Sequence, residues 1–126
     1  MIKNFRIFSL SSVALLCACG NTLTERENAE LSGAQLINEA REALVRSDYQ
    51  QAIELIDSIR AAYPLALNAR EDGILLKDSV LLQQAREELQ NAQELVSDTI
   101  DMEELQMKVT FYERKLQHDI EQKQAH

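Results

Sequence analysis

The sequence contains only two thiols, Cys17 and Cys19, and both follow an apolar stretch near the N-terminus. Basic residues precede this stretch, and the small residue Ala18 stands directly before Cys19. This order is typical of a cleavable secretory leader, which is too short to remain as a membrane-spanning anchor. We therefore expect residues 1–18 to be removed, so that the sulfur of Cys19 becomes available for modification at a new N-terminus.

The segment Leu16-Cys17-Ala18-Cys19 resembles the lipobox of bacterial lipoproteins, where a peptidase cuts before a cysteine that carries lipid. The resemblance implies a covalent diacylglycerol and an acyl chain on Cys19, no other cofactor, and attachment to a membrane of the cell envelope. In a Gram-negative host, Gly20 in place of an aspartate favours the outer membrane and a domain that faces the periplasm. The alternative is an ordinary secretory leader followed by a chance cysteine.

Removal of the leader and lipidation of Cys19 would leave no free thiol, which excludes disulfides, cysteine-ligated metals and a cysteine nucleophile. The leader holds two of the 13 basic residues, so 11 basic residues face 21 acidic ones and the net charge becomes −10. Such a chain repels nucleic acid and anionic lipid surfaces. We therefore expect no nucleic-acid partner, and we expect the acyl chains to provide the membrane attachment.

The other residue types that support catalysis are not arranged for it. His118 has no second histidine at helical spacing that would complete a metal pair. The serines lack the glycine-flanked turn of a nucleophile, and there is no glycine-rich loop to bind phosphate. Glu104 with Lys108, and Asp119 with Lys123, have the spacing of exposed pairs within a helix. We predict no catalytic residue, no metal site and no small-molecule substrate.

The elements that would position any site are helical, because the apolar residues recur at helical spacing and no strand pattern is present. The fold class is therefore predicted to be all-α. Residues 19–31 are polar and are predicted to form the lipidated N-terminus and a flexible tether. Ser32 and Gln35 match a capping box for a first helix, and Pro64 ends a second helix because it lacks a backbone donor. Residues 32–64 thus form a predicted helical hairpin.

This hairpin resembles one tetratricopeptide repeat over residues 34–64. The residues that carry the resemblance stand at the spacing of the repeat: Leu36, Ala40, Leu44, Asp48-Tyr49-Gln50-Gln51-Ala52-Ile53, Ile56 and Tyr63-Pro64. Such a repeat implies that the small residues Ala40 and Ala52 let its two helices approach closely. The ending Tyr63-Pro64 is also similar, by weak analogy, to repeats of outer-membrane assembly lipoproteins of Gram-negative bacteria. The alternative is a generic helical hairpin.

Two groups of side chains are candidates for binding a protein or peptide partner. By the resemblance to the repeat, the first group would face a ligand or the next helix: Ile37, Arg41, Leu44 and Val45. The second group is the ring pair Phe111 and Tyr112. Each group has a purely structural alternative, because Ile37, Leu44 and Val45 suit a core, and Tyr112 suits an apolar seam.

Residues 65–122 are predicted to form a long helical hairpin, followed by a disordered tail over 123–126. Four apolar residues spaced by seven indicate a coiled-coil-like seam on its first helix: Leu75, Leu82, Leu89 and Val96. Gly73 and Asp78 are expected to produce a bend or a solvent-facing edge there, because glycine weakens a helix and a carboxylate resists burial. Asp101 with Glu104 predicts the start of the returning helix.

A single repeat cannot cover its own apolar face, so another element must cover it. Either the long helices fold back and complete a four-helix α-domain, or their coiled-coil-like seam pairs with another copy or with a partner. Two functional predictions follow. The first is a membrane-anchored, non-catalytic module that binds a protein or peptide of the envelope, and the alternative is a self-associating coiled-coil spacer.

Overall fold

A computed structural model describes residues 23–95 and 100–126, and every regular element in this part of the chain is an α-helix. The helices are α1 (Glu25–Val45), α2 (Tyr49–Ala62), α3 (Leu67–Glu94) and α4 (Met102–Gln124). The all-α prediction is therefore confirmed. The predicted leader, Cys19 and Val96 lie outside the described residues. No helix of the described ranges combines the length and the apolar character needed to cross a membrane.

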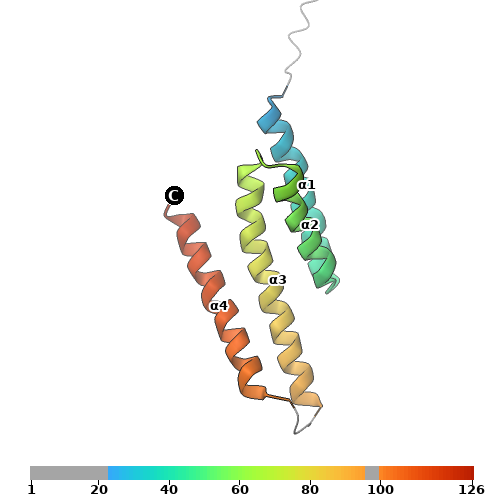
Figure 1. Ribbon diagram of the computed structural model, residues 1–126, viewed down its shortest axis with the longest axis vertical. Coiled ribbons are helices and arrows are strands. Elements are labelled where there is room, and N and C mark those ends of the chain that lie inside the picture. The colour runs from blue at the N-terminus through green and yellow to red at the C-terminus, as the bar shows by residue number, and fades with distance from the viewer. Residues whose placement is uncertain (1–22, 96–99) are drawn as a thin grey trace, which may run out of the picture.

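The long helix α3 is the central element of the molecule (Figure 1). It packs against α1 and α2 on one side and against α4 on the other, whereas α4 packs against α3 alone within the described residues. The fold-back over the first hairpin is thus made by α3. The predicted return helix lies on the opposite side of α3 and does not complete a four-helix core.

Two adjoining clusters of buried side chains form the core between α1, α2 and α3. The first contains Ala40, Ala43, Ala52, Ile56 and Val80, and the second contains Ile37, Ile59, Ala66 and Ala69. Ala40 and Ala52 are fully buried in the same cluster. Small side chains at these positions let α1 and α2 lie close together, as the repeat pattern predicts for a helical pair.

The first helix begins earlier than predicted, so the flexible-tether prediction is wrong for residues 25–31. Thr24 caps α1: its hydroxyl accepts a hydrogen bond from the Glu27 amide at 3.2 Å, and the Glu27 carboxylate accepts one from the Thr24 amide at 2.7 Å. This reciprocal pair is a capping box. Ser32 and Gln35, which match the same pattern, lie inside the helix.

The additional turns of α1 are held by a contact with the start of α3. The N-cap residue of α3 is Ala66, whose side chain cannot accept a hydrogen bond. Glu30 of α1 takes this role, because its two carboxylate oxygens accept hydrogen bonds from the amides of Asn68 at 2.9 Å and Ala69 at 3.1 Å. A carboxylate at a helix N-terminus is also favoured by the helix dipole. The contact fixes the first turns of α1 beside α3.

The turn between α1 and α2 is tight. The Asp48 amide donates to the Ala43 carbonyl at 2.9 Å, and the Ser47 amide donates to the Leu44 carbonyl at 2.9 Å. These two bonds form a Schellman motif, which places Ser47 at a φ of 58°. The Asp48 side chain then caps α2 by accepting a hydrogen bond from the Gln51 amide at 3.1 Å.

Close helix packing explains both glycines of the helical region. A Cβ atom at Gly33 would lie 2.6 Å from the Cβ of Ala69, and one at Gly73 would lie 3.2 Å from a methyl carbon of Ile56. The helix α3 continues without interruption through Gly73 and Asp78, and both residues are buried. The predicted solvent-facing edge is therefore wrong, because Gly73 packs against the α1–α2 hairpin and Asp78 is covered by α4.

The predicted seam of α3 faces α4 in the same chain. Leu82, Ala85 and Ala92 are buried, and they lie on the same helical face as Asp78, which pairs with Lys115 of α4. The helix α4 begins with Asp101 as its cap, as predicted, because the Asp101 side chain accepts a hydrogen bond from the Glu104 amide at 3.1 Å. It continues through Gln124, so the predicted disordered tail is wrong for residues 123–124.

Charged side chains tie α4 to α3 across this seam. The helices are joined by ion pairs between Glu88 and Lys108, between Arg86 and Glu113, between Asp78 and Lys115, and between Asp72 and Lys123. Lys108 and Lys123 therefore reach across to α3 rather than pair with the acidic residue four positions earlier. None of the residues of α4 is fully buried. The ion pairs therefore help to determine which residues of α4 lie opposite which residues of α3.

Candidate functional site

Two grooves lie along the N-terminal half of α3, one on each flank. The α1–α3 groove has a volume of about 610 Å³ and is lined by Leu23, Arg26, Glu27, Glu30, Leu31, Ala34, Ile37, Asn38, Arg41, Asn68, Ala69 and Asp72. The α2–α3 groove has a volume of about 330 Å³ and is lined by Ile56, Asp57, Arg60, Leu67, Arg70, Glu71, Gly73, Ile74 and Lys77. Both grooves remain open because α4 packs against α3 alone among the described helices.

The α1–α3 groove has an apolar floor and a charged rim. Its floor includes Ile37, which is 2% exposed, and Ala69, which is also buried. Leu31 is 61% exposed and adds an open apolar wall. Arg26, Arg41, Glu27, Glu30 and Asp72 provide charges of both signs around the apolar surface. An apolar surface with a mixed rim suits a peptide or helix that places apolar side chains inward and pairs its own charges at the edge.

The structure brings together only part of the first predicted partner group. Ile37 and Arg41 both line the α1–α3 groove. Leu44 is half-buried and packs against the core cluster, so its contact is structural. Val45 is 85% exposed at the end of α1 and does not belong to the core. These four positions therefore have three different environments, because they extend over more than two turns of one helix.

The second predicted partner group lies on α4. The rings of Phe111 and Tyr112 meet edge to face, with centroids 5.2 Å apart and planes at 73°. Phe111 is 61% exposed and lies beside the equally exposed Met107, while Tyr112 is half-buried. Tyr112 thus contributes to the seam, as its structural alternative proposed. Phe111 and Met107 form an apolar strip on the outer face of α4.

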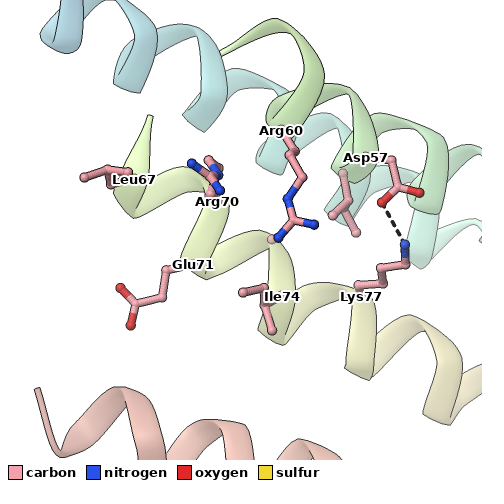
Figure 2. A pocket seen from close by; sticks show the side chains of 9 residues that line it. Asp57, Arg60, Leu67, Arg70, Glu71, Ile74 and Lys77 are labelled. Carbon is pink, nitrogen blue, oxygen red and sulfur yellow. Dashed lines mark hydrogen bonds and ion pairs between the residues drawn. The ribbon is translucent and has the colours of Figure 1, made fainter. Parts of the chain in front are cut away.

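Figure 2 shows the α2–α3 groove, which the sequence analysis did not identify. Arg60 extends from α2 across the groove toward α3, and Lys77 closes one end through an ion pair with Asp57 at 2.7 Å. At the other end, the Arg70 guanidinium donates to the Pro64 carbonyl at 3.0 Å. Three cationic side chains against two acidic ones make this groove locally basic in an acidic protein. Helical periodicity could not reveal it, because its walls come from two helices whose relative position is set by the core.

A cluster of charged groups lies between α3 and α4, and it suits a structural role. Asp78 is 2% exposed, and its Oδ1 atom lies 2.6 Å from the ammonium of Lys115, which also contacts Asp119 at 2.9 Å. The other oxygen of Asp78 has no hydrogen-bond partner among the described residues. Burial raises the pKa of Asp78, and the nearby Asp119 raises it further, against the lowering effect of Lys115. A ligand in either groove does not reach this buried carboxylate.

The pKa values of the two α4 residues shift in the directions that an ion-pair network produces. Burial alone would lower the pKa of Lys115, but its hydrogen bonds to Asp78 and Asp119 outweigh this effect and raise the pKa. The hydrogen bond from Lys115 holds the pKa of Asp119 below its usual value. At neutral pH, Lys115 and Asp119 are therefore charged, and the lysine is held between two carboxyl groups.

No group of three histidine, cysteine or acidic side chains within the described ranges is arranged to hold a metal ion. No protein-family model, curated protein or solved structure matches the chain.

Proposed function

We propose that this protein is a lipoprotein of the bacterial cell envelope that binds a protein or peptide partner in the α1–α3 groove without catalysing a reaction. The groove is the observation that carries this proposal. It combines a buried apolar floor at Ile37 with an open apolar wall and the charged rim residue Arg41. Grooves of this kind accept an amphipathic helix or an extended segment through apolar anchors and peripheral charges.

The membrane attachment is supported by the sequence pattern Leu16-Cys17-Ala18-Cys19 behind a basic and apolar leader. Acylation of Cys19 would hold the helical domain at a membrane through more than one acyl chain, which gives a more stable attachment than a single chain. In a Gram-negative host, Gly20 favours the outer membrane and exposure to the periplasm.

Site-specific photo-crosslinking in intact cells tests the partner groove. A photoreactive amino acid at Asn38, which lines the groove, is expected to give one discrete adduct with another protein. The same amino acid at Gln50, an exposed residue of α2, is the matched control and is expected to give none. Reversal of the rim charge by Arg41→Glu should abolish the Asn38 adduct while the circular dichroism spectrum stays unchanged. Equal adducts at Asn38 and Gln50 would argue against a binding role for the groove.

The alternative function, a self-associating spacer, is supported by the exposed apolar strip of Met107 and Phe111 on α4. The seam of α3 itself is covered by α4, so self-association through that seam would require α4 to move away. A photoreactive amino acid at Phe111 separates the two functions. An adduct of two copies of this chain through Phe111, with none through Asn38, would favour the spacer.

A further inference from the structure

The N-terminus of α1 and the turn between α2 and α3 lie at the same end of the molecule (Figure 1). Four large apolar side chains at this end are about half exposed, although each could have been polar without loss of the core. We call these residues the leucine end: Leu23, Leu31, Leu65 and Leu67, which are 46%, 61%, 44% and 51% exposed. Of the other exposed large apolar residues of the described chain, Ile74 lines the α2–α3 groove, Val45 and Leu95 lie at the far ends of α1 and α3, and Met107 and Phe111 lie on α4.

We propose that the leucine end rests on the lipid bilayer in which Cys19 is anchored, with its leucine side chains in the interfacial layer. This inference depends on the lipid anchor of the proposed function, and it adds a specific orientation of the helical domain. The occupant of Leu65 and Leu67 is then a phospholipid surface, whereas Leu31 also forms a wall of the α1–α3 groove, where it remains open to the proposed protein partner.

The length of chain between Cys19 and α1 provides the first argument. Because α1 is capped by Thr24, only residues 20–23 separate the anchor from the folded domain. Even when fully extended, this segment allows the Cα atoms of Cys19 and Thr24 to be at most about 17 Å apart. The headgroup layer of a bilayer is itself about 5–8 Å thick on each side. A lipid on Cys19 would therefore hold the start of α1 within about 17 Å of the anchor, which is close enough for the leucine end to reach the interfacial layer.

The charges at this end provide the second argument, because a bilayer surface disfavours acidic groups with unsatisfied hydrogen bonds. The Glu27 carboxylate accepts a hydrogen bond from the Thr24 amide, and the Glu30 carboxylate accepts two from the start of α3. These bonds reduce the water that each carboxylate must lose near an apolar phase. Arg26 is exposed at the same end and can contact lipid phosphate groups. The third acidic residue of this end, Glu25, is exposed beside Leu65 and must keep its water among the headgroups.

The inference is tested with an environment-sensitive fluorophore on the lipidated chain. The proposed processing leaves no free thiol, so the wild-type protein isolated from membranes should take up no maleimide dye. A Leu65→Cys variant carries one thiol at the leucine end, and Val45→Cys is the matched control. Val45 is also apolar and exposed, but it lies at the opposite end of α1, about 30 Å from the start of that helix. Both variants are labelled with a nitrobenzoxadiazole dye and reconstituted into phosphatidylcholine vesicles.

The expected result is a blue shift and a several-fold rise in emission for the dye at position 65 on reconstitution, with quenching by lipids that carry a shallow nitroxide. The dye at position 45 should show neither change. A further Leu67→Glu substitution should reduce the response at position 65, whereas Leu95→Glu at the opposite end should leave it unchanged. Circular dichroism of each variant shows whether the helices are intact.

Each other result has a distinct meaning. If wild-type protein reacts with the maleimide or fails to float with vesicles, the lipid anchor itself is wrong. If the labelled protein floats but the dye at position 65 remains in an aqueous environment, the anchor stands and the orientation is overturned. If a Cys19→Ala chain shows the same blue shift without vesicles and in proportion to protein concentration, a second copy covers the leucines and the proposal fails.

Discussion

The carboxylate of Asp78 in α3 lies 2.6 Å from the ammonium group of Lys115 in α4, and Asp78 is the one charged residue among the buried residues of α3. The Lys115 side chain is partly exposed to solvent, whereas the Asp78 side chain is buried. A buried ion pair contributes little net stability compared with a well-packed apolar pair, but the loss of one partner is costly. The pair can instead select one register of α4 on α3, because any shift along the helix leaves Asp78 without its cation.

Replacement of the cation tests this relationship. Lys115→Met should lower the free energy of unfolding by about 1–3 kcal/mol, because it leaves the Asp78 carboxylate buried without a partner. Lys108→Met is the control, since it breaks a more exposed pair with Glu88 and should cost less than about 1 kcal/mol. Urea unfolding followed by circular dichroism measures both. Equal losses would mean that Asp78 is as well solvated as Glu88.

The pH dependence of stability provides a second test. The pKa of Asp78 is raised above 3.8 in the folded state, so this residue favours folding most below pH 3.8, and the benefit is lost as the pH rises through the raised pKa. The pKa of Asp119 is lowered, so its contribution is present above pH 3.8 and is lost as the pH falls through the lowered value. The stability of the wild type relative to Asp78→Asn should therefore decline as the pH rises from about 3.8 through the raised pKa of Asp78. A difference that increases with pH would contradict the burial of Asp78.

The two helical glycines should respond differently to alanine. Gly33→Ala should destabilise the fold by about 1–3 kcal/mol, because its Cβ would collide with the Cβ of Ala69, which cannot move away without a shift of α3. Gly73→Ala meets a methyl group of Ile56 at 3.2 Å, and the gain in helix propensity of about 1 kcal/mol offsets a small adjustment there. The melting temperature of Gly33→Ala should therefore be well below that of Gly73→Ala. The reverse order would place the closest helix contact at Gly73.

Loss of the long-range cap should weaken the start of α3. Glu30→Ala removes the acceptor for the amides of Asn68 and Ala69 and should cost about 0.5–2 kcal/mol. Glu25→Ala is the control, because Glu25 is a glutamate of the same helix, lies in its exposed first turn and makes no such bond to α3 within the described structure. Hydrogen exchange at the first turn of α3 should increase only in the Glu30 variant. Exchange that increases equally in both would mean that general fraying of α1, rather than the cap, controls this turn.

The turn between α1 and α2 offers a stabilising change. Ser47 has a φ of 58°, a left-handed conformation that glycine adopts without a Cβ clash. Ser47→Gly should raise the free energy of unfolding by about 0.5–1 kcal/mol, while Ser47→Ala should not. The denaturant midpoints of the two variants, compared with that of the wild type, test this prediction. A loss of stability in Ser47→Gly would indicate that the serine hydroxyl supports the turn.

The sequence alone determined the elements that depend on local interactions. The ends of α2 follow from Asp48 and Pro64, and the start of α4 follows from Asp101, because caps and proline act within a few residues of themselves. The helical class follows from apolar periodicity in the same way. Thr24 and Glu27 also match a capping box in the sequence, at the early start of α1. Ser32 and Gln35 match the same motif, and the contact of Glu30 with α3 favours the earlier start.

Only the tertiary structure decided what depends on residues distant in sequence. Asp78 is buried because Lys115 lies opposite it, and Lys108 and Lys123 bind α3 because α4 packs there, although each has a nearer acidic residue in its own helix. The α1–α3 groove likewise brings Ile37 and Arg41 beside Asp72, while Leu44 and Val45 of the same predicted group lie elsewhere. The physical reason is that periodicity assigns a residue to a face of its helix, whereas the packing of the helices decides which neighbour that face meets.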